Sequence, residues 1–434
     1  MAAPMTLDLL EIAQVTKKFG KCVQIGSLLV HVAGVDARIG ELCELVGPGD
    51  LRRLGEVLAL KDECLVLCPY EGVEGLSSQT RVYPLGRSQT IPVGTQMLGR
   101  VLDSLGNPMD GLGGFPVEAW VSTENSPPDP MERAPIEHFM PTGIRAMDGL
   151  LPFAVGQRIG IFAPAGGGKS TLLGMLTRGC QADIVVIALI GERGREVKEY
   201  VDDVLGPEGL ARSVLFVATA DRHSIERARC AFSATAAAEY FRDQGMSVLL
   251  LVDSVTRFGR AQREIGLAVG EPPTRRGYPP SLFARLPKLF ERAGNAKIGS
   301  ISAIYTVLME DEDTADPLAE EVRSLLDGHI VLSRTLGENG HYPAIAVDES
   351  LSRLANRLMT KAHAQSAKVF RKMMAKQKEM DMVIKLGEYV EGNDPEADRA
   401  IQSKPTMLQF LQQSTDEEGP WDEMLEYLES ITRE

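Results

Sequence analysis

The chain has 434 residues, which is enough for about two or three domains with a sizeable core. Apolar residues make up 44% of the chain and charged residues 24%, as in ordinary soluble globular proteins. The formal net charge of −14 and the isoelectric point near 5.1 argue against a protein that binds nucleic acid over a large surface. No apolar run is long enough to cross a membrane, and residues 1–18 show no signal peptide. Because the six cysteines include no Cys-x-x-Cys pair, we expect a reducing, cytosolic location.

Residues 1–95 contain short apolar runs separated by glycine and aspartate at intervals of about ten residues. This spacing predicts a small β-barrel or sandwich as an N-terminal domain. Nothing in this region points to catalysis, so we expect a structural or oligomerising role. The expected strands are 22–25, 28–32, 41–45, 55–60 and 64–68.

Residues 96–350 have the pattern of an α/β domain. After a turn-rich start and a proline-rich loop at 122–135, apolar runs alternate with helical patterns such as 224–243. The alternation predicts a largely parallel sheet that is covered by helices on both faces. Ligands bind such sheets at the carboxyl ends of the strands. The expected strands are 159–162, 184–190, 214–218, 248–252, 300–307 and 329–332.

Residues 351–434 carry no strand signal and are expected to form a helical C-terminal domain. The composition predicts a long helix over 357–386 and a second helix over 395–413. From Met407 to the end of the chain there are eight acidic residues and one arginine. We expect this tail to be a solvated terminal helix in preference to a dedicated docking motif.

Residues 163–171 organise the central domain. They read Ala-Pro-Ala-Gly-Gly-Gly-Lys-Ser-Thr and lie between a predicted strand and a predicted helix. This arrangement predicts a phosphate-binding loop, in which backbone N–H groups point inward, Lys169 reaches the β- and γ-phosphates and Ser170 supplies a hydroxyl to Mg²⁺. The usual pattern begins with glycine, where this chain has Ala163. The expected nucleotide contacts in the loop are Ala165, Gly166, Gly167, Gly168, Lys169, Ser170 and Thr171.

Asp253 ends the apolar run 248–252 and is the expected partner of Mg²⁺, through water. A hydrolase also needs a carboxylate that orients the attacking water. Many ATPases place a glutamate directly after this aspartate, but the next residue here is Ser254. The carboxylate must therefore come from another strand end.

Glu192 follows the predicted strand 184–190 and is the best candidate for that carboxylate. Glu196 lies one helical turn further on, and we expect it to orient or pair with other groups of the site. Arg193 and Arg257 have two open interpretations, as contacts of the γ-phosphate or as salt-bridge partners within the site.

Several of these motifs together resemble the catalytic subunit of the rotary ATP synthases and its relatives. They are Pro141-Thr-Gly-Ile-Arg145, the phosphate loop, and the runs 190–196, 251–257 and 327–334. Residues 270–283 and 299–308 are more specific and resemble the type III secretion ATPases of flagella and injectisomes. The resemblance covers nearly the whole chain, from about Gly99 to Gln413, and the β-rich N-terminal region agrees with it.

This resemblance implies a homohexameric ring. The β-barrel closes the ring, a phosphate-loop (RecA-like) central domain binds ATP between subunits, and a helical C-domain faces the export gate or its substrates. By position, the resemblance implies Glu192 as the catalytic carboxylate, Tyr342 as the ring that stacks on adenine, and Arg353 as an arginine finger from the neighbouring subunit. The residues alone favour an ordinary partly buried aromatic for Tyr342. The acidic turn 310–317 either faces a central pore and stalk or is a solvated loop.

The implied function is ATP hydrolysis that energises protein export by a type III secretion apparatus, with release of chaperones and unfolding of cargo. ATP and Mg²⁺ are the implied cofactors. The implied partners are stalk and stator-like regulator proteins, chaperone–cargo complexes and the export gate, at the cytoplasmic face of the inner membrane and without nucleic acid. Two alternatives stay open, a catalytic subunit of a rotary proton-translocating ATP synthase and an RNA-dependent hexameric helicase such as the termination factor. The stretch 270–283 disfavours the synthase, and the acidic isoelectric point disfavours the helicase.

Overall fold

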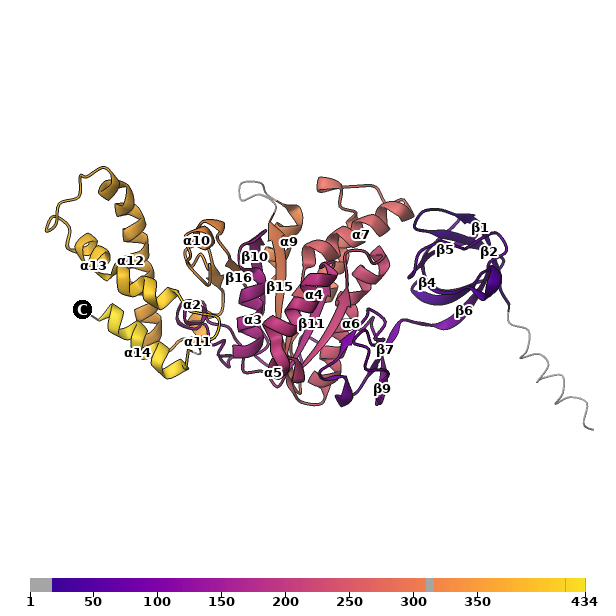
Figure 1. Ribbon diagram of the computed structural model, residues 1–434, viewed down its shortest axis with the longest axis horizontal. Helices are drawn as coiled ribbons and strands as arrows, with labels where there is room; N and C mark the ends of the chain where they lie inside the picture. The colour runs from indigo at the N-terminus through magenta and orange to yellow at the C-terminus, as the bar shows by residue number, and fades with distance from the viewer. Residues whose placement is uncertain (1–17, 310–315, 418, 434) are drawn as a thin grey trace, which may run out of the picture.

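The computed structural model describes residues 18–309, 316–417 and 419–433. Along its long axis, a β-barrel lies at one end, a large sheet with its helices in the middle, and a group of helices at the other end (Figure 1). This arrangement confirms the predicted fold class. Residues 1–17 and 310–315 lie outside the described part of the chain, so our expectations for the N-terminus and the acidic turn stay predictions.

The N-terminal barrel closes through antiparallel strands in the order β1-β2-β5-β4-β3-β6, with β1 paired to β6. Alternate side chains such as Val30 and Val32 point into its apolar interior. The sequence analysis missed β6, because Pro84 and Gly86 interrupt its pattern. The bounds are β1 Gly20–Ile25, β2 Val30–Ala33, β3 Glu41–Val46, β4 Arg52–Lys61, β5 Cys64–Pro69 and β6 Arg81–Ser88.

The central sheet has the strand order β17-β16-β10-β15-β13-β11-β12-β8. Its strands are parallel except β17, which is antiparallel to β16, and β14, which pairs antiparallel with β15. The largely parallel sheet is therefore confirmed, while the two-residue edge strands β8 and β17 were not predicted. The bounds are β8 Val101–Leu102, β10 Arg158–Pro164, β11 Ile184–Ile190, β12 Ser213–Ala218, β13 Ser247–Asp253, β14 Gly294–Asn295, β15 Ser300–Met309, β16 Gly328–Val331 and β17 Leu351–Ser352; β7 Thr90–Val93 and β9 Ala119–Ser122 form a separate pair.

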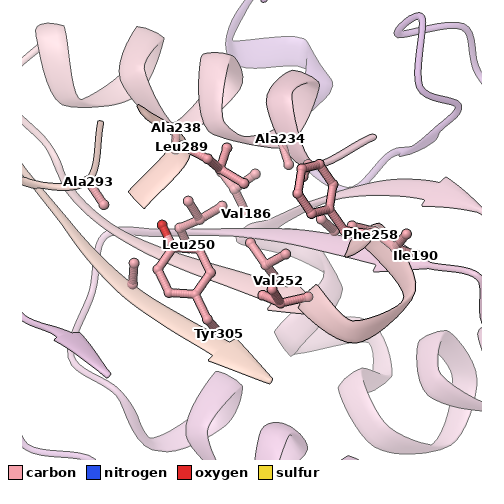
Figure 2. Packing of buried hydrophobic residues seen from close by; sticks show 14 of the residues in the cluster. Val186, Ile190, Ala234, Ala238, Leu250, Val252, Phe258, Leu289, Ala293 and Tyr305 are labelled. Atoms are coloured by element: carbon pink, nitrogen blue, oxygen red, sulfur yellow. The ribbon is translucent and has the colours of Figure 1, made fainter. Parts of the chain in front are cut away.

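Both faces of the central sheet are buried, which explains why its strands are continuous apolar runs. Every residue of β11 is buried, and successive residues such as Val185 and Val186 join different hydrophobic clusters on opposite faces of the sheet. Figure 2 shows one of these clusters, where Val186 and Ile190 lie below Ala234 and Ala238 of α6. The small alanine side chains let this helix lie close to the sheet.

Helices α6, α7 and α8 cover that face, and α2 and α3 cover the other together with the C-terminal helices. The predicted helix 224–243 is α6. The predicted helix after the phosphate loop is α3, which begins at Lys169. The bounds are α2 Arg145–Leu150, α3 Lys169–Gly179, α4 Gly194–Glu199, α5 Gly206–Ala211, α6 Ser224–Asp243, α7 Val255–Val269, α8 Pro280–Phe290, α9 Pro317–Leu325 and α10 Arg334–Glu338.

The C-terminal region is helical, but the single helix predicted over 357–386 is wrong in one respect. The chain breaks it into α11 and α12, because the Thr360 side chain accepts a hydrogen bond from the His363 N–H at 3.2 Å and so caps a new helix. None of the helices within the described ranges is long and apolar enough to cross a membrane. The bounds are α11 Ala355–Leu358, α12 Lys361–Lys385, α13 Pro395–Leu411 and α14 Trp421–Thr432.

The terminal helix is only partly solvated. One face of α14 buries Met424, Leu428 and Ile431 in the cluster that covers the second face of the sheet. At the start of this helix the Trp421 ring lies against Phe139, with ring centroids 4.2 Å apart. The acidic tail is therefore attached to its own central domain.

A buried ion pair joins the barrel to the central domain. Arg229 of α6 donates through Nε to the Glu56 carboxylate of β4 at 2.8 Å, and both side chains are almost fully buried. The hydroxyl of Tyr70, which directly follows β5, donates to the same carboxylate at 3.1 Å. Burial of a charged pair is tolerated only with such extra hydrogen bonds. The pair therefore fixes the barrel against α6.

Replacing Arg229 by alanine should destabilise the protein by about 3–5 kcal/mol, because Glu56 would stay buried without its cation. The matched control is Arg52→Ala, which breaks the solvent-exposed Arg52–Glu44 pair of the barrel and should cost less than about 1 kcal/mol. Urea denaturation followed by circular dichroism compares the two. Equal stability of both variants would show that the buried pair does not hold the domains together.

Candidate active site

The phosphate loop occupies the turn between β10, which ends at Pro164, and α3, which begins at Lys169. Gly166 and Gly168 have φ of 75° and 79°, a left-handed conformation that favours glycine. The turn leads into an eleven-residue helix whose first N–H groups have no partner within the helix and can bind an anion. Ala163 is a fully buried residue of β10, so alanine fits inside the strand where the usual pattern has glycine.

Lys169 contacts two carboxylates of its own chain. Its Nζ donates to Asp253 Oδ1 and lies 3.4 Å from Glu192 Oε1. Asp253 ends β13 and is buried, and it also accepts a hydrogen bond from the Thr306 hydroxyl of β15 at 2.7 Å. The ends of β10, β13 and β11 thus bring the predicted lysine, aspartate and glutamate together at the carboxyl edge of the sheet, where β15 lies between β10 and β13.

Glu192 lies directly after β11, where the sequence analysis expected it. Its Oε2 is 3.2 Å from Arg257 Nη1, and the same guanidinium donates to the Gly191 carbonyl oxygen. A hydrogen bond from Glu192 lowers the pKa of Glu196 below its usual range. Glu192 is therefore oriented by Arg257 on one side and by Glu196 on the other.

The two arginines left open by the sequence differ in their surroundings. Arg257 lies in the site as the salt-bridge partner of Glu192. Arg193 is largely exposed and pairs with Glu196 at 3.3 Å, away from Lys169. Ser254, which replaces the glutamate of other ATPases, accepts a hydrogen bond from the Arg257 N–H and caps α7.

A cavity of about 150 Å³ opens beside these groups and is lined by Ser170, Glu192, Glu196, Tyr200 and Asp253 among others. Hydroxyl and carboxylate oxygens are the ligands that Mg²⁺ prefers. Within the described residues no group of three or more His, Cys, Asp or Glu side chains could hold a metal alone. The residues therefore fit a Mg²⁺ ion that is held mainly by phosphate oxygens and water.

Tyr342 lies over the phosphate loop. A Cβ atom placed on Gly168 would come within 3.4 Å of the Tyr342 Cε1 atom, and the tyrosine remains 44% exposed. An exposed aromatic ring at the mouth of a phosphate site can stack on a base. The structure thus brings Tyr342 to the predicted nucleotide site, 173 residues along the chain from Lys169.

Arg353 is not brought to the phosphate loop of its own chain. It follows β17, its side chain is exposed, and its guanidinium donates to the Arg323 carbonyl oxygen at 3.3 Å. Burial, then Arg323 and Arg353, lower the pKa of the nearby His329. This border of the sheet therefore presents positive charge to the outside.

Two groups of the site were missed by the sequence analysis. Thr306 holds Asp253, and the buried Tyr200 lines the cavity. For Thr306 a signal was available, because a hydroxyl residue near the end of an otherwise apolar strand needs a partner. Tyr200 belongs to a single π-helical turn, Tyr200–Leu205, which no pattern in the sequence predicts.

Three family models match the chain, and together they span most of it. The nucleotide-binding domain of the ATP synthase alpha/beta family matches residues 143–352, and the beta-barrel domain of the same family matches residues 22–86. The C-terminal domain of the T3SS EscN ATPase matches residues 359–430. The last match separates the chain from the rotary ATP synthases.

Individual proteins agree with the family models. A type 3 secretion system ATPase of Xanthomonas euvesicatoria is 52% identical over 419 residues, with 96% of this chain and 95% of the relative covered. A flagellum-specific ATP synthase of Bacillus subtilis is 44% identical over 434 residues, with 100% and 99% covered. The solved structure of the assembled ATPase EscN from the enteropathogenic E. coli type III secretion system matches with a TM-score of 0.91 at 46% identity, over 95% of this chain and 100% of that chain. With its barrel, its phosphate-loop sheet and its matching helical domain, the chain belongs to the family of type 3 secretion system and flagellum-specific ATPases and is an ATPase.

Proposed function

We propose that this enzyme hydrolyses Mg²⁺-bound ATP at the phosphate loop to energise protein export, with release of chaperones and unfolding of cargo. One observation carries the proposal. Lys169, Asp253 and Glu192 converge from the carboxyl ends of β10, β13 and β11, and Ser170 lines the cavity beside them. Such a set provides the phosphate cradle, the metal partners and the carboxylate that phosphoryl transfer to water requires.

Each residue then has a role. The N–H groups of the loop from Ala165 to Thr171 hold the phosphates, and Lys169 turns from its carboxylates to the β- and γ-phosphates. Ser170 and Asp253 would hold Mg²⁺, which neutralises phosphate charge when bound. Glu192 orients the attacking water, and Arg257 fixes the rotamer of Glu192.

The remaining cations act at the γ-phosphate. Arg193 is free to turn inward because its present pair with Glu196 is solvent-exposed and weak. Arg353 would act in the site of a neighbouring subunit, since in its own chain it lies on the outside of the far sheet border. Tyr342 would stack on adenine. The enzyme thus works as a ring in which each site is completed by the next subunit.

The comparisons support a ring with partners. The structure of assembled EscN with its central stalk EscO matches this chain with a TM-score of 0.89 at 45% identity. We propose a homohexamer that binds a stalk and a stator-like regulator, receives chaperone–cargo complexes and contacts the export gate at the cytoplasmic face of the inner membrane. We also propose three domains, with boundaries near residues 95 and 350. Since β17 pairs with β16, we place the second boundary just after Ser352.

Glu192→Gln tests the chemistry at this site. It should lower kcat by about 10²–10⁴-fold and leave ATP binding close to that of the parent, because the carboxylate acts only in the transition state. Steady-state hydrolysis and equilibrium binding of ATP measure the two effects. Glu264→Gln is the control, since Glu264 pairs with Arg227 on the surface. If Glu192→Gln loses binding and turnover in proportion, Glu192 is structural and Glu196 becomes the candidate.

A further inference from the structure

We propose that Gln413 is a positioning residue for the base end of the nucleotide, through which the C-terminal helical region sets the affinity for the base. The inference rests on one part of the proposed function, the stacking of the base on Tyr342. It goes beyond that role, because it assigns the support of the tyrosine to a residue of a different domain.

The C-terminal region forms one wall of the base pocket. A cavity of about 510 Å³ lies beside Tyr342, and its lining includes Pro405, Leu408 and Gln412 from the end of α13 and the turn after it. The opposite wall comes from the central domain through Tyr342 and Arg145. A ligand that stacks on Tyr342 therefore touches two domains at once.

Gln413 connects these two walls. It is buried, with 5% of its surface exposed, and its backbone N–H donates to the Tyr342 carbonyl oxygen at 2.9 Å. Its side-chain Nε2 donates to the Gly143 carbonyl oxygen at 2.7 Å and to the Glu417 carbonyl oxygen at 2.8 Å. Its Oε1 accepts from the Arg145 N–H at 2.9 Å. One residue thus joins three segments that are far apart in the sequence.

Gln413 is bonded to a segment of the central domain that has its own hydrogen bonds. The buried Asp148 carboxylate accepts hydrogen bonds from the N–H groups of Thr142 and Gly143 at 2.9 and 3.0 Å, which fixes the segment before α2. From the same segment, the Arg145 guanidinium donates to the Phe410 carbonyl oxygen at 3.1 Å, at the end of α13. A cation at a helix C-terminus stabilises that end. The end of α13 is therefore held by a fixed part of the central domain.

Gln413 has no contact with the phosphate loop, Asp253 or Glu192 among its hydrogen bonds. Losing its side chain would remove the partner of the Gly143 carbonyl oxygen and of the Arg145 backbone N–H, and it would loosen the peptide whose N–H holds Tyr342. Loss of the Gln413 side chain should thus weaken binding of the base and leave the rate of phosphoryl transfer unchanged. This separates Gln413 from a residue that merely stabilises the fold.

The test is Gln413→Ala in the full chain, with binding of ADP–Mg²⁺ and of inorganic tripolyphosphate measured by calorimetry. ADP should bind about tenfold more weakly, which is within the range for stacking a base on an aromatic ring. Tripolyphosphate, which has no base, should bind as to the parent. KM for ATP should rise by the same factor with kcat nearly unchanged. Gln377→Ala is the control, because Gln377 donates to the Ala400 carbonyl oxygen between α12 and α13 at 2.6 Å.

A double-mutant cycle shows whether Gln413 affects ADP binding through Tyr342. In a Tyr342→Ala background, Gln413→Ala should cause no further loss of ADP affinity, since it acts through the tyrosine. Additive losses, or equal weakening of ADP and tripolyphosphate, would overturn the proposal. If Tyr342→Ala alone leaves ADP affinity unchanged, the stacking role fails and this inference with it, while the phosphate site stands. If Gln413→Ala does not fold, Gln413→Glu is used, because it removes only the amide donor. ADP binding should again weaken while tripolyphosphate binding stays unchanged.

Discussion

Replacing Lys169 by alanine should abolish ATP hydrolysis, with kcat/KM reduced by at least about 10³-fold, the scale of losing a cation that stabilises the transferred phosphoryl group. The side chain pairs with Asp253 and Glu192 at the carboxyl edge of the sheet, so we expect the fold to survive. Without the lysine, Asp253 would lose its cation and Glu192 would keep only Arg257, so the added negative charge would also repel the triphosphate. Nucleotide binding should therefore weaken together with catalysis.

The control for this variant is Lys198→Ala, since Lys198 is an exposed lysine of α4 that pairs only with Asp202. It should hydrolyse ATP as the parent does. Phosphate release measures turnover, and circular dichroism checks that both variants are folded. Near-parental turnover of a folded Lys169→Ala protein would refute the assignment of the site.

Arg353→Ala should bind ATP as the parent does and hydrolyse it about 10³–10⁵-fold more slowly, the range for removing an arginine finger. The reason is positional. The guanidinium is exposed on the sheet border and donates to the Arg323 carbonyl oxygen, whereas the phosphate loop, Asp253 and Glu192 meet in the same chain without it. For the parent enzyme, the rate per subunit should rise steeply with protein concentration as rings form.

Mixing Arg353→Ala with Lys169→Ala decides whether the finger acts in trans. Each interface needs one intact loop and one intact finger, so rings with both mutant subunits regain some working sites. Activity of the mixture should exceed that of either variant alone. In the control mixture, Arg433→Ala takes the place of Arg353→Ala beside Lys169→Ala. Arg433 is exposed and pairs with Glu429. If mixed rings form but hydrolyse ATP no faster than either variant alone, Arg353 is a structural residue of its own subunit.

Much of the fold follows from local patterns in the sequence. Strands such as β11 and helices such as α6 are long and strongly patterned, and their predicted ranges agree with the structure. The failures occur where the pattern is short or broken. β6 contains proline and glycine, and Thr360 ends one helix and starts another through a single hydrogen bond. Such local events weigh little in a composition that otherwise favours a helix.

The site divides in the same way. The loop residues are predictable because their spacing within one strand–turn–helix unit determines the geometry, and Asp253 is predictable because it ends an apolar strand of the same sheet. The pairing of Arg229 with Glu56 joins positions 173 residues apart, and only the packed structure brings them together. The same is true of Gln413, which the sequence presents only as the polar last residue of a predicted helix. Its importance comes from three partners that lie in other parts of the chain.

The contacts of Lys169 have a consequence for which anions the enzyme admits. Two internal carboxylates already neutralise this lysine, so it exerts little pull on a passing anion. If free phosphate bound the lysine, the buried Asp253 carboxylate would lose its counter-ion. This loss costs a large amount of free energy. A triphosphate that brings its own divalent cation supplies a substitute charge in the same exchange. We therefore expect the enzyme to favour metal-bound nucleotide at entry and to release the product phosphate when Asp253 and Glu192 pair with Lys169 again.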